Sequence, residues 1–383
     1  MRKSASTPRY TVCLAALLMA MAAVMFNFSA RATSATWTGG TSALWSDTNN
    51  WVGLPVTAPG SNELATFNAS SVNTTIDLTG GVTISSNLFD TASVSAYTIG
   101  SGVAGAQTLT NAAPGAITVN ATVVNNQLFN ANLSLGTTTN FAKAFTIANN
   151  SSTANLTFAG AVSTAVTGTN TITLGGSGNH ITFNGPIYNG SGAVALVKAI
   201  TTNSVILSTS NNFLSVGFAG GVNQGDNGTI RVSHSDALTG ATITMNGQND
   251  TTQTIDLANN VTLTNRIFSN SRTAGRPMIR NVSGTNTYAG LYIATATGGG
   301  VTFEANGGKL NMTGGFITTN SVSARGLQLQ GTGGGEISYT LLSTFVGVVT
   351  KTGSGSWTLS ASNAFPSINP FNGGTLVSAH PNS

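Results

Sequence analysis

A short segment occurs three times in this chain of 383 residues, and this repetition constrains the fold more than any other feature. The copies begin at Leu207, Val282 and Leu359, which are 75 and then 77 residues apart. Each copy contains an asparagine followed two positions later by an aromatic residue: Asn211 and Phe213, Asn286 and Tyr288, and Asn363 and Phe365. A unit that recurs at a near-constant interval is typical of architectures built by stacking similar turns.

Short alternating segments fill the chain from about Val72 onward. Segments such as Ile117–Asn120 and Val301–Glu304 alternate apolar and polar residues, and breaks fall at glycine and asparagine. This pattern predicts short β-strands joined by turns. Propeller blades recur every 40–50 residues, whereas an interval of about 76 is close to three solenoid turns of roughly 25 residues. We therefore predict an all-β fold, a right-handed parallel β-helix whose repeated asparagines and aromatic residues stack at corners.

Residues 1–32 have the features of a secretory signal peptide. Arg2, Lys3 and Arg9 are followed by the apolar segment 12–28 and by the small-x-small sequence at 30–32. An apolar segment of 17 residues is at the lower limit for crossing a bilayer. We expect cleavage after Ala32 and a secreted or cell-surface protein without a membrane span, and an uncleaved anchor is the alternative.

Removal of this leader changes the charge balance. The leader holds four of the 14 lysine and arginine residues, which leaves 10 basic against 10 acidic groups. A neutral mature chain lacks the basic surface that nucleic acids require, so we expect no nucleic-acid partner. The only cysteine, Cys13, also lies in the leader, which excludes disulfides and thiolate metal sites from the mature chain.

Three tryptophans, Trp37, Trp45 and Trp51, lie close together at the start of the mature chain. The first turn of a stack exposes apolar interior and a strand edge, and residues 33–70 are predicted to form a cap over them. The alternative is a glycan-binding platform on which the three indoles stack against sugar rings.

The last copy carries a resemblance to a known family. Residues 351–365, followed by residues 373–377, resemble the autotransporter-associated β-strand repeat of bacterial surface proteins, which runs Lys-x-Gly-x-Gly-x-Leu-x-Leu-Ser-Gly-x-Asn-x-Tyr-x-Gly and ends in Gly-Gly-Thr-Leu. Degenerate copies lie at about 196–232, 282–303 and 351–377, within a predicted solenoid of residues 71–383. The resemblance implies a passenger-type β-helix in an exported bacterial protein. Pro366 and Pro370 depart from the pattern.

Motifs with a defined chemistry are scarce. Residues 100–105 match Gly-x-Gly-x-x-Gly, but no helix is predicted after them and no acidic residue lies between Asp90 and Asp226, so the match is interpreted as a glycine turn. His180, His234 and His380 lack metal-ligand spacing. We therefore expect no catalytic residues, no cofactor and no metal site.

One region nevertheless concentrates charge: Asp226, Asp236, Asp250, Asp256, Arg266, Arg272, Arg276 and Arg280. Carboxylates on adjacent turns could bind Ca²⁺ while an arginine acts on an acidic polysaccharide, or these could be solvated turn residues. We predict a non-enzymatic structural or adhesive solenoid whose partners are polysaccharides or other surface proteins. A polysaccharide lyase or hydrolase and a glycan-binding module are the alternatives.

Overall fold

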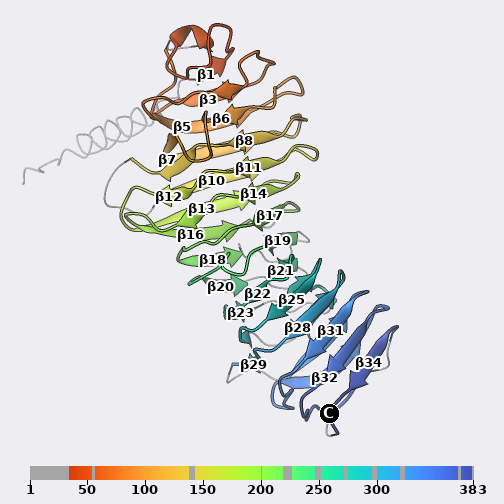
Figure 1. The fold of residues 1–383 in the computed structure, drawn as a ribbon. Helices are drawn as coiled ribbons and strands as arrows, with labels where there is room; N and C mark the ends of the chain where they lie inside the picture. Colours follow the sequence, from red (N-terminus) through yellow and green to blue (C-terminus); the bar gives the residue numbers. More distant parts are fainter. Residues whose placement is uncertain are drawn as a thin grey trace, which may run out of the picture.

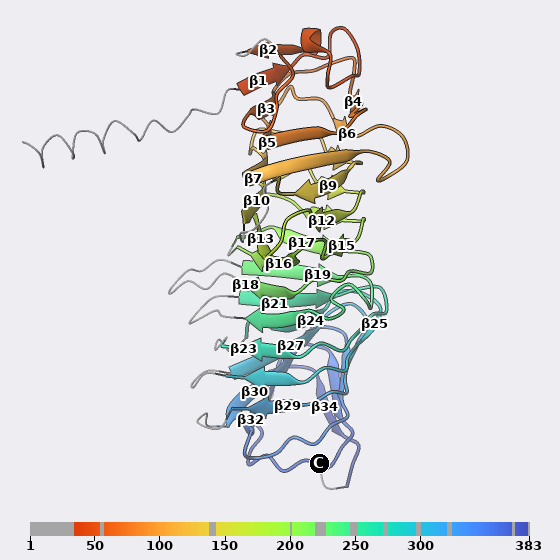
Figure 2. The ribbon, with the colours of Figure 1, turned by 90° about the vertical axis from the view of Figure 1, so that its left-hand side faces the viewer.

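The computed structural model describes residues 34–53, 57–137, 143–199, 201–218, 227–245, 252–270, 275–295, 300–319, 324–369 and 372–381. The described chain is almost entirely β and includes one short 3-10 helix, η1 (Thr48–Asn50). The strands form an elongated β-solenoid of about 10 turns, in which each turn lies on the one before it (Figures 1 and 2). The prediction of an all-β parallel solenoid is confirmed.

Three sheets form the faces of the solenoid. Sheet 1 follows the order β2 (Trp51–Gly53), β1 (Ser34–Trp37), β3 (Leu64–Phe67), β5 (Val82–Phe89), β7 (Thr108–Val119), β10 (Ala144–Asn149), β13 (Thr169–Gly175), β16 (Ala193–Lys198), β18 (Ser215–Phe218), β20 (Thr242–Met245), β23 (Ile267–Ser269), β26 (Tyr292–Ala294) and β29 (Phe316–Thr318). A branch from β7 contains β9 (Asn132–Leu135), β12 (Val162–Thr164) and β15 (Ile187–Tyr188). Only the β1–β2 pair is antiparallel among the described strand pairs, and it lies at one end of the sheet.

The other two sheets complete the turns. Sheet 2 contains β4 (Thr75–Ile76), β6 (Thr98–Ile99), β8 (Gln127–Phe129), β11 (Leu156–Phe158), β14 (Ile181–Phe183), β17 (Ser204–Leu207), β19 (Asn227–Val232), β21 (Thr252–Leu257), β24 (Ile279–Asn281), β27 (Gly300–Ala305), β30 (Arg325–Gln330) and β32 (Val346–Lys351). Sheet 3 contains β22 (Thr262–Leu263), β25 (Thr285–Tyr288), β28 (Lys309–Met312), β31 (Gly334–Ile337), β33 (Ser356–Leu359) and β34 (Thr375–Ser378). It begins only in the second half of the stack.

The length of a turn agrees with the sequence period. Residues paired across sheet 2 are separated by 24 positions between Ile181 and Val205, by 25 between Thr229 and Thr254, and by 21 to 30 over the whole sheet. The predicted turn of roughly 25 residues is therefore confirmed. Its variation means that equivalent positions cannot be located by counting alone.

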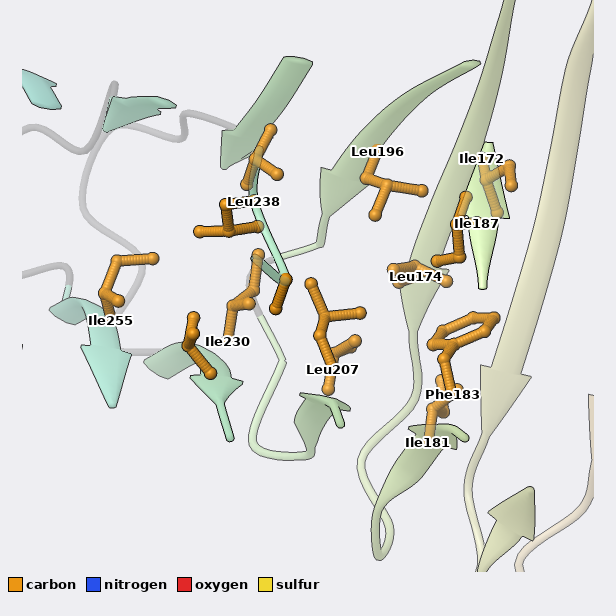
Figure 3. Close-up of a cluster of buried hydrophobic side chains, with 14 of the residues drawn as sticks. Ile172, Leu174, Ile181, Phe183, Ile187, Leu196, Leu207, Ile230, Leu238 and Ile255 are labelled. Carbon is orange, nitrogen blue, oxygen red and sulfur yellow. The ribbon is translucent and has the colours of Figure 1, made fainter. Parts of the chain in front are cut away.

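The interior is filled by alternate side chains from every face. Figure 3 shows isoleucine, leucine and phenylalanine side chains pointing inward from several successive turns. In sheet 2, Phe129, Phe158 and Phe183 are in register and their rings stack, with centroids 5.1 and 5.0 Å apart. The period-two alternation in the sequence thus becomes one continuous apolar core along the stack.

The repeated asparagines bind the main chain of the preceding turn. Asn211 and Asn286 are buried and Asn363 is half-buried. The Oδ1 atom of each accepts a hydrogen bond from a backbone N–H in the turn before: Asn211 from Ile187 at 2.6 Å, Asn286 from Val261 at 2.7 Å, and Asn363 from Leu341 at 2.9 Å. Because each lies against an apolar residue there, the prediction that the asparagines stack on one another is wrong. They satisfy backbone groups between turns.

The first two repeat copies occupy equivalent corners, and the third does not. Leu207 ends β17 and Val282 follows β24, which is three strands further along sheet 2, so the interval of three turns is confirmed for this pair. Leu359 instead ends β33 of sheet 3. The third copy is therefore displaced by one face of the solenoid, because the three turns after β24 span 24, 26 and 22 residues and together are shorter than the 77 residues that separate these copies. Phe213 and Tyr288 are buried, and Phe365 is half-buried.

Candidate functional site

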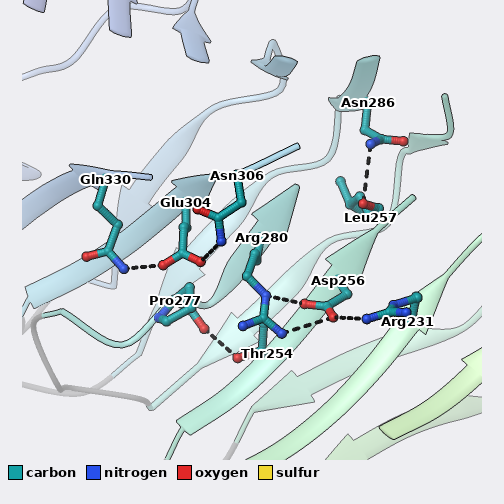
Figure 4. Close-up of polar contacts among 10 residues, drawn as sticks. All are labelled: Arg231, Thr254, Asp256, Leu257, Pro277, Arg280, Asn286, Glu304, Asn306 and Gln330. Atoms are coloured by element: carbon teal, nitrogen blue, oxygen red, sulfur yellow. Dashed lines mark hydrogen bonds and ion pairs between the residues drawn. The ribbon is translucent and has the colours of Figure 1, made fainter. Parts of the chain in front are cut away.

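Charged and polar side chains form a column on the outer face of sheet 2, and we call these residues the charge column (Arg231, Asp256, Arg280, Glu304 and Gln330). Strand pairing places Arg231 of β19 beside Asp256 of β21, which in turn lies beside Arg280 of β24. Glu304 of β27 and Gln330 of β30 continue the same line. Figure 4 shows two groups of contacts along this line: Arg231, Asp256 and Arg280 on three successive strands, and Glu304 with Gln330 on the next two.

Asp256 is the centre of the charge column. Its side chain is 0% exposed, whereas the side chains of Arg231 and Arg280 are each 30% exposed. Arg280 donates from Nε to Oδ1 at 2.8 Å and from Nη2 to Oδ2 at 3.0 Å, and Arg231 donates from Nη2 to the same Oδ2 at 3.3 Å. Two-point contact between a guanidinium and a carboxylate is both strong and directional. The carboxylate therefore links three turns and is enclosed by its partners.

The environment of Arg280 keeps its guanidinium charged. Burial alone would lower the pKa of Arg280, but the hydrogen bond and the negative charge of Asp256, with a contribution from Glu304, outweigh burial and raise it. An arginine that acts as a general base has to lose a proton, and nearby negative charge opposes that loss. The geometry therefore favours a structural ion pair over the reactive arginine of the enzyme hypothesis.

The other charged residues predicted in this region do not gather around Asp256. Asp236 has a side chain that is 63% exposed and lies 4.0 Å from Nδ1 of His234. Arg266 lies just before β23, on the outer face of sheet 1, and Arg276 precedes β24. Asp226, Asp250 and Arg272 lie outside the described residues. Within the described ranges, no three acidic, histidine or cysteine side chains form a group that could hold a metal ion.

Two charged members of the charge column, Arg231 and Glu304, and the polar Gln330 were missed by the sequence analysis. Arg231 precedes Asp256 by 25 positions and Glu304 follows Arg280 by 24, so each is one turn away from a predicted residue. The period that predicted the solenoid could have identified them, had it been applied to individual charged residues.

Two lysines inside the solenoid were also missed. Lys198 is in register with Leu174 and Phe218 in sheet 1, and Lys351 is in register with Leu329 in sheet 2, and both lysines are fully buried. Their aliphatic stems occupy interior positions. Each ammonium donates to carbonyl oxygens where the strand ends: Lys198 to Ala199 and Thr201, and Lys351 to Thr352 and Gly353.

The three N-terminal tryptophans form one buried cluster. Trp37, Trp45 and Trp51 are 0%, 2% and 4% exposed. Trp51 contacts Trp45 and Trp37 edge to face, with ring centroids 4.7 and 5.0 Å apart, and Phe67 packs beside them. Trp45 also lines a hollow of about 400 Å³, and its Nε1 donates to the carbonyl of Pro59. Little indole surface is free for stacking on sugars, and the assignment of this segment as a cap stays a prediction.

We expect the folded protein to show weak quenching of tryptophan fluorescence by acrylamide and strong quenching after unfolding in urea. All four tryptophans of the chain, the three in this cluster and Trp357, are at most 4% exposed. The measurement is a quenching titration in both states. Quenching of the folded protein as strong as that of the unfolded chain would contradict the buried cluster. Sugar-dependent quenching that is lost in Trp45→Ala would favour the glycan platform.

No family model, no curated protein and no solved structure matches this chain. The resemblance to autotransporter-associated repeats therefore stays a prediction, whereas the β-solenoid itself is observed. Over the residues that the structure describes, no helix is long and apolar enough to cross a membrane.

Proposed function

We propose that this chain is a secreted or cell-surface β-solenoid with a structural or adhesive role and without catalytic activity. The proposal combines the solenoid fold with the resemblance of residues 351–377 to repeats of bacterial surface proteins. Because one fold hosts many functions, we infer the role from the side chains.

The observation that supports the proposal most strongly is the ion pair between Asp256 and Arg280. These residues were the strongest candidates for chemistry in the sequence, and they are bound to each other in a contact that joins neighbouring turns. The buried lysines and the repeat asparagines are likewise bound to main-chain groups. Polar groups that could serve a reaction are used here to hold the stack together.

The outer surface supports an adhesive role. Threonines lie in register on neighbouring strands, as Thr146 beside Thr173 in sheet 1 and Thr157 beside Thr182 in sheet 2, and all four are exposed or half-exposed. A rigid stack that repeats hydroxyl and amide groups can make many weak contacts with one extended partner. Contacts linked in this way give a combined affinity above that of any single contact.

Export and lack of catalysis are tested separately. Cells that make the full chain should release or display a protein that begins at Thr33, as measured by the mass of the exported product, and recovery of the uncleaved chain inside the cell would contradict export. The purified protein should form no unsaturated product from uronate polymers in the presence of Ca²⁺. Product that appears with the native protein and disappears with Arg280→Ala would instead establish a lyase.

A further inference from the structure

A hollow of about 480 Å³ lies at one corner of the solenoid, where two successive turns enter sheet 1. It is formed around β20 and the residues before β23, near the middle of the stack in Figure 1. Its lining includes Gly240, Thr242, Thr264, Arg266 and Phe268. Its volume falls in the usual range for small-molecule sites, and it lies away from the charge column on sheet 2.

Arg266 brings an uncommitted positive charge to this hollow. Its side chain is exposed and, among the described residues, makes no hydrogen bond or ion pair. Arg231 and Arg280 differ in this respect, because both are bound to Asp256. A free guanidinium offers two parallel N–H donors, which match the two oxygens of a carboxylate.

Phe268 brings an aromatic ring to the same side of the sheet. It is two residues after Arg266, so both side chains point outward and their Cα atoms are roughly 7 Å apart. The pairing of Ile243 with Ile267 and of Thr244 with Phe268 places Thr242 beside Arg266 and Thr244 beside Phe268. Phe268 is half-exposed and lines the hollow, so part of its ring is accessible to a ligand there.

Hydroxyl groups complete the lining. Thr242 and Thr264 are exposed, and each offers one donor and two acceptor sites. Asn265 directly follows Thr264 and fixes the corner, because its Nδ2 donates to the carbonyls of Leu238 at 2.7 Å and Ala241 at 2.8 Å. The corner is thus held by the neighbouring turn, while the charge, the ring and the hydroxyls are left facing solvent.

We propose that this hollow binds a carboxylate-bearing sugar unit of a polysaccharide. Arg266 binds the carboxylate, Phe268 packs against the apolar face of the sugar ring, and the threonines bind ring hydroxyls. The spacing of Arg266 and Phe268 suits a carboxylate attached directly to the ring, and the hydroxyl lining favours a sugar over an acidic peptide. The inference rests on the proposed adhesive function and names the class of partner.

Titration of the full chain with tri-galacturonate, and with neutral galactotriose as the matched probe, tests the proposal. We expect saturable binding of the acidic trimer that weakens with added salt, and at least about tenfold weaker binding in Arg266→Gln, the loss typical of a charged hydrogen-bonded pair. Phe268→Leu, which keeps an apolar side chain without the ring, should weaken it severalfold. Lys309→Gln removes a positive charge from a surface ion pair elsewhere and should change nothing.

Three results would overturn the assignment: no saturation by the acidic trimer at low-millimolar concentration, equal binding of the neutral trimer, or equal affinity in Arg266→Gln. An aspartate-rich peptide that binds as tightly as the acidic trimer would also reject a sugar as the partner. Thermal unfolding of each variant confirms that the fold is retained. A chain found at the cell surface without this binding overturns only the inference, whereas a chain retained in the cell that binds the trimer overturns only the proposed function.

Discussion

Replacement of Asp256 by alanine is expected to lower the free energy of unfolding by about 3 kcal/mol. Removal of one partner of a buried ion pair typically costs about 3–5 kcal/mol, and the lower end applies because the two arginines are each 30% exposed. The variant leaves two guanidinium groups on the same column without the carboxylate between them. Stability is measured by urea unfolding followed by circular dichroism.

The solenoid fold makes a second, local measurement informative. Each turn contacts mainly its neighbours, so a lost contact between turns should loosen those turns first. In Asp256→Ala we expect faster amide hydrogen exchange in β19, β21 and β24, with little change in β8 and β11. Asp236→Ala, which removes an exposed carboxylate one turn away, is the matched control.

Replacing Arg231, Asp256 and Arg280 together tests whether the stability lost in Asp256→Ala comes from unpaired charge or from lost packing. A buried ion pair exchanged for apolar residues of similar volume is often neutral or stabilising, whereas a half-removed pair is not. The triple variant Arg231→Met, Asp256→Leu, Arg280→Met should therefore recover most of the stability lost in Asp256→Ala. A loss below about 1 kcal/mol in Asp256→Ala, typical of an exposed pair, would show that the column contributes little.

Much of this architecture could be predicted because one physical rule repeats along the chain. An interior that accepts every second side chain imposes period-two alternation on each strand, and stacked turns impose a period near 25 residues. The same period explains why Asp256 and Arg280, which are 24 positions apart, meet on one face. Both residues lie in one charged region of the sequence, but the contact between them becomes visible only in the structure.

The features that could not be predicted depend on which residues of successive turns are paired, and local sequence patterns do not determine this register. Turn length varies along the stack: the paired residues Leu327 and Val349 are 22 positions apart, whereas Thr98 and Leu128 are 30 apart. Because of this variation, the repeat copy at Leu359 lies on a different face from the earlier copies, although its sequence resembles theirs. Trp357 makes another contact that local sequence patterns do not predict. Its ring lies against Gly335 of the previous turn, where a Cβ atom would come within 2.3 Å of the indole, and this pairing of a large with a small residue is visible only in register.

The buried lysines could not be predicted because a charged residue at an interior position breaks the pattern on which the prediction rests. A lysine can nevertheless occupy such a position when its stem packs with the core and its ammonium reaches carbonyl groups at the strand end. Lys198 does this, with Nζ 2.8 Å from the carbonyl oxygen of Ala199 and 2.9 Å from Oγ1 of Thr201. Among the described residues, no carboxylate contacts this ammonium, which makes its charge state sensitive to pH.

The free energy of unfolding is therefore expected to rise between about pH 7 and pH 9. Burial lowers the pKa of Lys198 from its ordinary value of 10.5 to about 7 in the folded state. Between these two values the unfolded chain binds a proton that the folded chain does not, so stability increases with pH, by at most about 1.4 kcal/mol per pH unit for one proton. Below pH 7 the lysine is protonated in both states, and the full penalty of burying the ammonium remains. Burial also lowers the pKa of Lys351, which adds a change of the same sign.

Urea unfolding at several pH values from 7 to 9 tests this expectation, because few other groups titrate in that range. Lys198→Met retains the apolar stem without the ammonium, so the rise in stability with pH should become shallower. Lys309→Met changes a lysine whose side chain is 45% exposed and should leave the slope unaltered. A slope that is unchanged in Lys198→Met would mean that the ammonium is equally protonated in the folded and unfolded states. The three oxygen acceptors around Nζ would then compensate fully for the burial of its charge.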